Sequence, residues 1–138
     1  MLSDEIRDRL VEAAKQARIN AYAPYSKDFK VGAAVLTEDE RIFEGCNIEN
    51  SSFGATICAE RVAIFKAVCE GFRKIKALAV ATQSTPPDPP CGLCLQVLAE
   101  FSDSAEIIMI NTAGNIKISN IRRLLPASFK LRGGKGDV

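Results

Sequence analysis

Residues 76–82 read Lys-Ala-Leu-Ala-Val-Ala-Thr, a short run that is apolar at every position except its two ends. A strand with one face in water alternates apolar and polar residues, whereas a strand covered on both faces has a continuous apolar run. This stretch therefore predicts a central strand. Because helical patterns precede and follow it along the chain, we expect a sheet with helices on both faces.

Helical and extended patterns alternate on both sides of this central strand. Ser3 or Asp4 is expected to cap a first helix, which Pro24 prevents from continuing. The runs 29–37 and 41–47 predict an antiparallel hairpin. Further along the chain we expect a largely buried helix over 58–70, a helix that begins at the cysteine pair 91–94, strands over 107–110 and 116–118, and a short helix over 121–125. The predicted fold class is α/β: a three-layer α/β/α domain with a mixed sheet of about five strands.

The length and composition fit one globular domain. The chain has 138 residues, of which 47% are hydrophobic and 25% are charged, and this composition excludes a disordered or fibrous chain. We expect residues 1–138 to form a single domain with a mobile tail at 133–138. The formal net charge of +1 favours neither nucleic acid nor a membrane as a partner. Because the N-terminus is charged and lacks the apolar middle of a signal peptide, we expect a cytoplasmic protein.

Five cysteines and no histidine restrict the chemistry that the chain can perform. An odd number of thiols in a cytoplasmic protein is better explained by metal binding or catalysis than by disulfides. Cys46 and Cys69 are interpreted as small residues of the core. Cys58 begins one predicted helix and Cys91 and Cys94 begin another, and helix N-termini stabilise thiolates. Three protein ligands with a fourth position left for water are typical of a catalytic zinc site.

Glu60 lies two residues after Cys58, on the first turn of the same predicted helix. From there its carboxyl group can reach a zinc-bound water without coordinating the metal, so Glu60 is the candidate proton shuttle. Two other interpretations stay open. Glu60 is also explained as an ordinary acidic residue of a first helical turn, and Cys91 and Cys94 as a thiol-redox pair.

Several longer motifs surround these residues. In chain order they are Tyr25-Ser26, Phe29-Lys30-Val31-Gly32-Ala33-Ala34, Gly45-Cys46-Asn47-Ile48-Glu49-Asn50, Cys58-Ala59-Glu60-Arg61, Pro90-Cys91-Gly92-Leu93-Cys94 with Gln96, and Leu124-Leu125-Pro126-Ala127-Ser128-Phe129. With these motifs the sequence resembles the cytidine deaminase family, in particular its small, homotetrameric branch with three zinc-binding cysteines. A lone Cys-x-x-Cys is weak evidence, but all of these motifs in this order make a specific match.

The resemblance implies zinc-dependent hydrolytic deamination of cytidine and 2′-deoxycytidine to the uridine nucleosides, a reaction of pyrimidine salvage that releases ammonia. Cys58, Cys91 and Cys94 would bind Zn²⁺, and Glu60 would move protons to N3 and to the leaving amine. The resemblance also implies a homotetramer. The nucleoside contacts that it implies are Asn47 and Glu49 on the ribose hydroxyls, Phe29 against the pyrimidine ring, backbone groups of Ala59 and of the Cys91 loop on the base edge, and Phe129 in a neighbouring subunit's pocket.

The chain departs from the family pattern at two places. Leu95 follows the last zinc cysteine, where the family usually has arginine, so Arg61 and two helix N-termini are left to offset the negative charge of three thiolates on Zn²⁺. Residues 27–28 lie between Ser26 and Phe29, where the family commonly has one residue. Two alternative functions are the deamination of another aminopyrimidine nucleoside, such as a nucleoside antibiotic, and a non-catalytic zinc or thiol-redox module.

Overall fold

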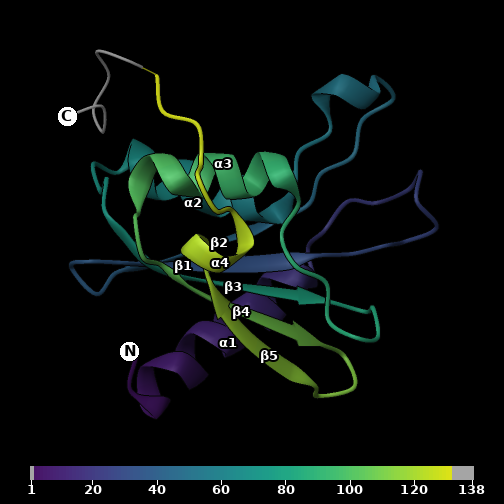
Figure 1. The fold of residues 1–138 in the computed structure, drawn as a ribbon. Coiled ribbons are helices and arrows are strands. Elements are labelled where there is room, and N and C mark those ends of the chain that lie inside the picture. The colour runs from purple at the N-terminus through teal and green to yellow at the C-terminus, as the bar shows by residue number, and fades with distance from the viewer. Residues whose placement is uncertain (1, 132–138) are drawn as a thin grey trace.

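The computed structural model describes residues 2–131 as one mixed sheet with helices on both faces (Figure 1). The elements, in chain order, are α1 (Asp4–Arg18), β1 (Gly32–Thr37), β2 (Ile42–Cys46), the 3₁₀ helix η1 (Phe53–Ala55), α2 (Ala59–Cys69), β3 (Ile75–Thr82), α3 (Gly92–Phe101), β4 (Glu106–Asn111), β5 (Ile116–Asn120) and α4 (Ile121–Leu124). The five strands have the order β2-β1-β3-β4-β5. Strands β3 and β4 are parallel, and the other neighbours are antiparallel. The predicted three-layer α/β/α class is confirmed.

Helix α1 covers one face of the sheet, and helices α2 and α3 cover the other (Figure 1). Side chains of the central strand β3 alternate between the two layers, as the pleat of a strand requires. Leu78 and Val80 belong to the core under α2 and α3. Ala77, Ala79 and Ala81 belong to the core under α1. The continuous apolar run therefore forms a strand covered on both faces, as the sequence predicts.

Helix starts place two cysteines at one end of the sheet. Ser3 caps α1, because its side chain accepts a hydrogen bond from the backbone N–H of Ile6. Cys58 and Cys91 hold the corresponding N-cap positions of α2 and α3 in extended backbone, and neither side chain makes a capping hydrogen bond. Both thiols can therefore bind other partners. Both also lie beside the first N–H groups of a helix, which have no partners within the helix.

The expectations that α2 is largely buried and that Cys69 is a core residue are wrong. Phe65 is 41% exposed, and Cys69 is exposed as well. The reason is the close approach of α2 to β2: a Cβ atom on Gly45 would lie 2.5 Å from the backbone N of Ala63. At this separation only small side chains fit on most of the inner face of the helix, and its bulky residues stand outward. The buried residues of α2 are Ala59, Glu60, Ala63, Ile64 and Ala67.

The sequence predicts a strand over 29–37, but β1 begins only at Gly32. Residues 29–31 lie outside the strands: their backbone bonds mainly to side chains, and the Val31 carbonyl accepts a hydrogen bond from the backbone N–H of Asn47. The expected mobile tail, 133–138, lies outside the described residues. Within residues 2–131, no helix is both long enough and apolar enough to cross a membrane.

Candidate active site

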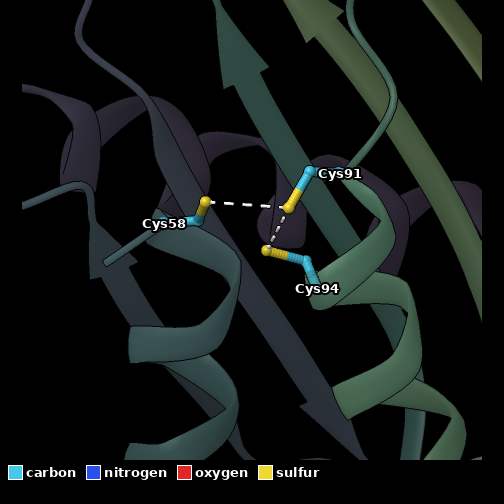
Figure 2. A group of neighbouring side chains, drawn as sticks. All are labelled: Cys58, Cys91 and Cys94. Atoms are coloured by element: carbon cyan, nitrogen blue, oxygen red, sulfur yellow. Dashed lines mark hydrogen bonds between the residues drawn. The ribbon is translucent and has the colours of Figure 1, made fainter. Parts of the chain in front are cut away.

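Cys58, Cys91 and Cys94 converge at the first turns of α2 and α3 (Figure 2). Their sulfur atoms all lie within 4.8 Å of one another. The Sγ atom of Cys91 is 3.8 Å from that of Cys58 and 3.4 Å from that of Cys94. The three cysteines singled out in the sequence therefore form one cluster, although 33 positions separate Cys58 from Cys91.

The spacing of these sulfur atoms fits a zinc ion. Zinc–sulfur bonds of about 2.3 Å in a tetrahedral arrangement place two ligand sulfurs about 3.8 Å apart, close to the 3.8 and 3.4 Å found here. Because the chain has no histidine, thiolates are the natural ligands. Cys94 is buried, Cys58 is half-buried and Cys91 is exposed. One side of the cluster is thus accessible to a water or a substrate, as a three-ligand catalytic site requires.

Positive charge faces the sulfur cluster. Hydrogen bonding from Cys94, helped by the Arg61 guanidinium, lowers the pKa of Cys58 to about 5. The Nη2 atom of Arg61 lies 3.4 Å from the Cys58 Sγ, and this contact raises the pKa of Arg61. For Cys94, the hydrogen bond to Cys58 and burial raise the pKa of the thiol. A guanidinium and the helix N-terminus at Cys58 therefore favour the anionic form of this one thiol.

Glu60 is 4% exposed on the first turn of α2. Burial, and then the negative charge of Cys58, raise the pKa of Glu60 to about 7. Glu60 lies two residues after the N-cap Cys58, so its buried carboxyl group belongs to the same helical turn that follows this cysteine. A carboxyl group with a pKa near neutrality can both accept and release protons, which is the property of a general acid–base catalyst.

A short segment that carries two predicted nucleoside contacts pairs with the residue before Cys58. Ile48 pairs with Ile57, the residue directly before Cys58. Asn47 and Glu49 flank Ile48, and alternate residues of an extended segment share one face. Asn47 and Glu49 therefore lie on the same side of this segment, which is hydrogen-bonded to Ile57, the residue before Cys58.

The Asn47 side chain is buried and binds the segment that contains Phe29. Its Nδ2 atom donates a hydrogen bond of 2.9 Å to the Phe29 carbonyl, and its Oδ1 atom accepts one of 2.8 Å from the Val31 N–H. A primary amide carries two N–H donors, so one hydrogen of Nδ2 is left for a ligand. The structure thus brings Asn47 and the half-buried Phe29 together, as is required if both contact one nucleoside.

Glu49 holds the loop that precedes Phe29. Its Oε1 atom accepts hydrogen bonds from the backbone N–H groups of Tyr25 (2.7 Å) and Ser26 (3.2 Å). Hydrogen bonding with Ser26 lowers the pKa of Glu49, so the carboxylate stays ionised. Glu49 also lines a hollow of about 300 Å³ together with Tyr25, Ser26, Asn50, Phe53 and Thr56.

Ala59 and Phe129 occupy opposite environments. Ala59 is fully buried as the first residue of α2, so only its backbone can face a ligand, and the N–H groups of a first helical turn lack helical partners. Phe129 is 67% exposed. Its carbonyl accepts a hydrogen bond of 3.1 Å from Gln96 Nε2 of α3. The C-terminal segment is therefore fixed to α3 while the Phe129 ring stands on the surface.

Leu95 is buried in the core under α2 and α3, with 6% of its surface exposed. It lies on α3 directly after Cys94 and contributes apolar packing. The cation at the cluster comes instead from Arg61 of α2, three residues after Cys58. Arg61 thus brings a positive charge to the cluster although position 95 has no arginine.

Four residues with hydrogen-bonded side chains, Tyr25, Ser51, Arg18 and Gln83, are given no role by the sequence analysis. The Tyr25 hydroxyl is 2.7 Å from Ser51 Oγ, and the side chains of Arg18 and Gln83 are 2.8 Å apart. Gln83 directly follows the central strand. Because ligand-binding residues of open α/β sheets gather at strand ends, a carboxamide at that position is the signal that could have identified it.

Residues 4–111 match the profile of one protein family, described as the cytidine and deoxycytidylate deaminase zinc-binding region. The chain belongs to the family of cytidine and deoxycytidylate deaminases. Membership makes it an enzyme with zinc as its cofactor, and the cluster of Cys58, Cys91 and Cys94 is suited to that ion. Both expectations from the sequence, a deaminase and a zinc cofactor, are confirmed.

Individual deaminases are similar over nearly the whole chain. The cytidine deaminase of Sporosarcina psychrophila is 50% identical over 123 residues, which cover 88% of this chain and 90% of that protein. The cytidine deaminase of Halalkalibacterium halodurans is 46% identical over 124 residues, 89% of this chain and 93% of that protein. Among solved structures, the cytidine deaminase from Burkholderia pseudomallei has a TM-score of 0.85 at 43% identity, covering 93% of this chain and all of that one.

Proposed function

We propose that this protein catalyses the zinc-dependent hydrolytic deamination of cytidine and 2′-deoxycytidine to the uridine nucleosides and ammonia. The observation that carries the proposal is the convergence of three cysteine thiols at the first turns of α2 and α3, with the buried Glu60 two residues after Cys58 on α2. Similarity to cytidine deaminases over about nine-tenths of their length supports the same reaction.

In this proposal Cys58, Cys91 and Cys94 hold the metal. Zinc, when bound, supplies a Lewis acid that lowers the pKa of a water molecule toward about 7. Glu60 accepts the proton of the attacking water and delivers protons to N3 and to the departing amine of the cytosine ring, as in zinc deaminases generally. Its raised pKa of about 7 suits both transfers. Arg61 contacts the Cys58 sulfur and favours its anionic form.

The nucleoside is proposed to bind beside the start of β1 and the end of β2. Asn47, with one amide hydrogen left, and Glu49 bind the ribose hydroxyls, and Phe29 provides an apolar wall for the pyrimidine ring. The backbone of Ala59 contacts the base edge, together with that of the loop at Cys91. Because Glu49 is held ionised, a phosphate close to the ribose would be repelled. The site therefore favours a neutral nucleoside over a nucleotide.

We also propose that the protein is a cytoplasmic homotetramer. Large apolar side chains are exposed near the site, on α2, α3 and the C-terminal segment: Phe65, Leu93 and Phe129. Association of copies would cover this apolar surface. Phe129, whose backbone is fixed to α3 by Gln96, would enter the pocket of a neighbouring subunit. Thiols that must stay reduced to bind zinc suit the cytoplasm.

Turnover of cytidine, 2′-deoxycytidine, CMP and cytosine tests this function. Deamination changes the ultraviolet absorbance, and released ammonia is measured in parallel. Both nucleosides should be converted with equal amounts of uridine nucleoside and ammonia, and CMP and cytosine should react at least about 100-fold less efficiently. A zinc-loaded protein that accepts only another aminopyrimidine nucleoside would favour the first alternative. A zinc-free protein with a redox-active Cys91–Cys94 pair would favour the second.

A further inference from the structure

Residues 29–31 directly precede β1 in the chain but do not belong to the strand. The ladder begins at Gly32, which pairs with Cys46 of β2 and with Ala81 of β3. Neither neighbouring strand provides regular pairing to the residues before Gly32. Backbone polar groups that are partly buried need other partners. The side chains of Asn47, Gln83 and Arg18 supply most of them, and the Phe29 N–H bonds to Ser26 Oγ.

On the β2 side, Asn47 takes the place of a longer strand. It is the first residue after β2, and its carboxamide bonds to the Phe29 carbonyl (2.9 Å) and to the Val31 N–H (2.8 Å). The backbone N–H of Asn47 donates to the Val31 carbonyl (3.1 Å). The Asn47 side-chain amide thus donates one hydrogen bond and accepts another, as a backbone peptide group of a longer β2 would.

On the β3 side, Gln83 is the first residue after the strand and faces Lys30. Its Oε1 atom accepts hydrogen bonds from the Lys30 N–H (3.4 Å) and from Nη2 of Arg18 (2.8 Å). Arg18, the last residue of α1, also donates from Nε to the Lys30 carbonyl (2.8 Å). Gln83 and Arg18 together therefore bind both polar groups of the Lys30 backbone.

We propose that Arg18 and Gln83 are positioning residues for the substrate, because they fix the Lys30 backbone and thereby set where the Phe29 ring meets the pyrimidine. The inference rests on the proposed function, in which Phe29 contacts the base. The residues just before Phe29 make such fixing necessary. Lys27 and Asp28 have φ angles of 55° and 61°, in the left-handed region that non-glycine residues rarely adopt. The turn into Phe29 therefore depends on contacts from outside it.

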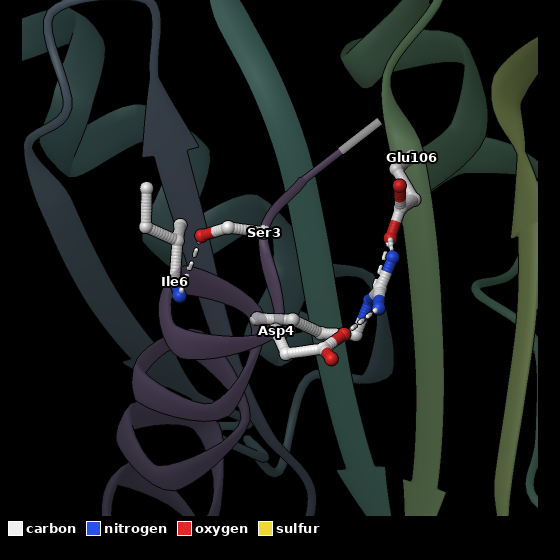
Figure 3. A network of polar contacts seen from close by, with 5 residues as sticks. Ser3, Asp4, Ile6 and Glu106 are labelled. Atoms are coloured by element: carbon white, nitrogen blue, oxygen red, sulfur yellow. Dashed lines mark hydrogen bonds and ion pairs between the residues drawn. The ribbon is translucent and has the colours of Figure 1, made fainter.

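The opposite end of α1 offers a matched control (Figure 3). Arg7 binds Glu106 at the start of β4, with Nε and Nη2 at 3.0 and 2.9 Å from Oε2. It also contacts Asp4 at 3.3 Å. Arg7 and Arg18 both tie α1 to the sheet, but Glu106 begins β4, whereas Gln83 follows the end of the parallel strand β3. Loss of Arg7 therefore weakens the same helix without touching the segment at Phe29.

The experiment compares cytidine kinetics of four zinc-loaded, full-length variants with the parent: Arg18→Met, Gln83→Met, Gln83→Glu and Arg7→Met. Arg18→Met and Gln83→Met should each raise KM for cytidine about threefold to tenfold, the effect of one or two lost hydrogen bonds. Their kcat should stay within about twofold and their zinc content should not change. Gln83→Glu keeps an acceptor oxygen for both donors and should restore the parent KM. Arg7→Met should lower Tm and leave KM unchanged.

Equal KM changes in Arg18→Met and Arg7→Met would show that general weakening of α1 is responsible, which overturns the inference. Unchanged KM in Arg18→Met and Gln83→Met would overturn it as well, and so would a KM for Gln83→Glu as high as that for Gln83→Met. In each of these cases the parent still deaminates cytidine, so the proposed function stands. Failure of the zinc-loaded parent to deaminate cytidine refutes the proposed function, and the positioning role falls with it.

Discussion

Gly45 lies in β2 beneath the first turns of α2, and its replacement by alanine is expected to displace the helix that begins at Cys58. A Cβ atom on Gly45 would lie 2.5 Å from the backbone N of Ala63 and 2.6 Å from the backbone O of Ala59. Real Cβ contacts are essentially never shorter than 3.0 Å, so helix and strand must separate by at least 0.5 Å. Both obstructing atoms belong to the backbone, so no flexible side chain can move aside instead.

A displacement of this size is larger than a zinc site tolerates. Metal–ligand distances in well-formed sites hold to within about 0.2 Å. In Gly45→Ala, Cys58 would shift with α2, while Cys91 and Cys94 would stay with α3. We expect the Kd for zinc to rise about tenfold or more, and the overpacked contact to cost about 1–3 kcal/mol of stability.

Competition with a chromophoric chelator measures the zinc affinity, and thermal unfolding measures the stability. Gly32→Ala is the matched control, because a Cβ atom there collides with the backbone of Ala14 and Arg18 in α1, on the face of the sheet without zinc ligands. This control should lose stability and keep its zinc affinity. Parent-like zinc binding by a destabilised Gly45→Ala, or an equal loss of affinity in Gly32→Ala, would refute the reasoning.

Three further substitutions test single residues of the site. Glu60→Gln keeps the size of the side chain but removes its base, so turnover should fall by about 10²–10⁴-fold with unchanged zinc content by metal analysis; near-normal turnover contradicts the assigned role. Phe129→Ala should raise KM for cytidine while zinc content stays constant, and sedimentation of the parent should show a tetramer; a fully active monomer would be incompatible with a pocket completed by a neighbour. Leu95→Arg buries a charge at a position that is 6% exposed, so it should lower the free energy of unfolding by about 2 kcal/mol or more. It should not raise kcat/KM, because Arg61 already contacts the sulfur cluster. A stable, faster enzyme would show that the cluster lacks a cation.

The layers of the fold could be predicted because burial on two faces leaves a local pattern. The apolar run 76–82 lies within β3 (Ile75–Thr82), and its side chains divide between the two cores. The exposed face of α2 could not be predicted in the same way. The spacing of Phe65 and Cys69 shows that they share a face, but periodicity does not show whether that face meets the sheet or the surface. The close approach of α2 at Gly45 decides this, and it is a property of the folded chain.

The candidate site likewise has a part that could be predicted from the sequence and a part that could not. The zinc cluster could be predicted because cysteines at helix starts carry their chemistry in a short motif. The contact between Arg18 and Gln83 could not, because 65 positions separate the two residues and neither belongs to a motif. The first residue of β1 could not be predicted from the sequence either, because residues 29–31 have the same strand-like pattern as the residues that follow. Only the arrangement of β2 and β3 shows that their strand pairing ends there and that side chains take over.

Zinc titration of the metal-stripped protein, with cytidine turnover followed by ultraviolet absorbance, tests the central claim most directly. The claim is that Cys58, Cys91 and Cys94 hold one catalytic zinc beside Glu60. It predicts negligible turnover without metal, a linear rise in activity up to one zinc per chain, and no further rise beyond that ratio. Full turnover by the zinc-free protein, or none at one zinc per chain, would contradict it.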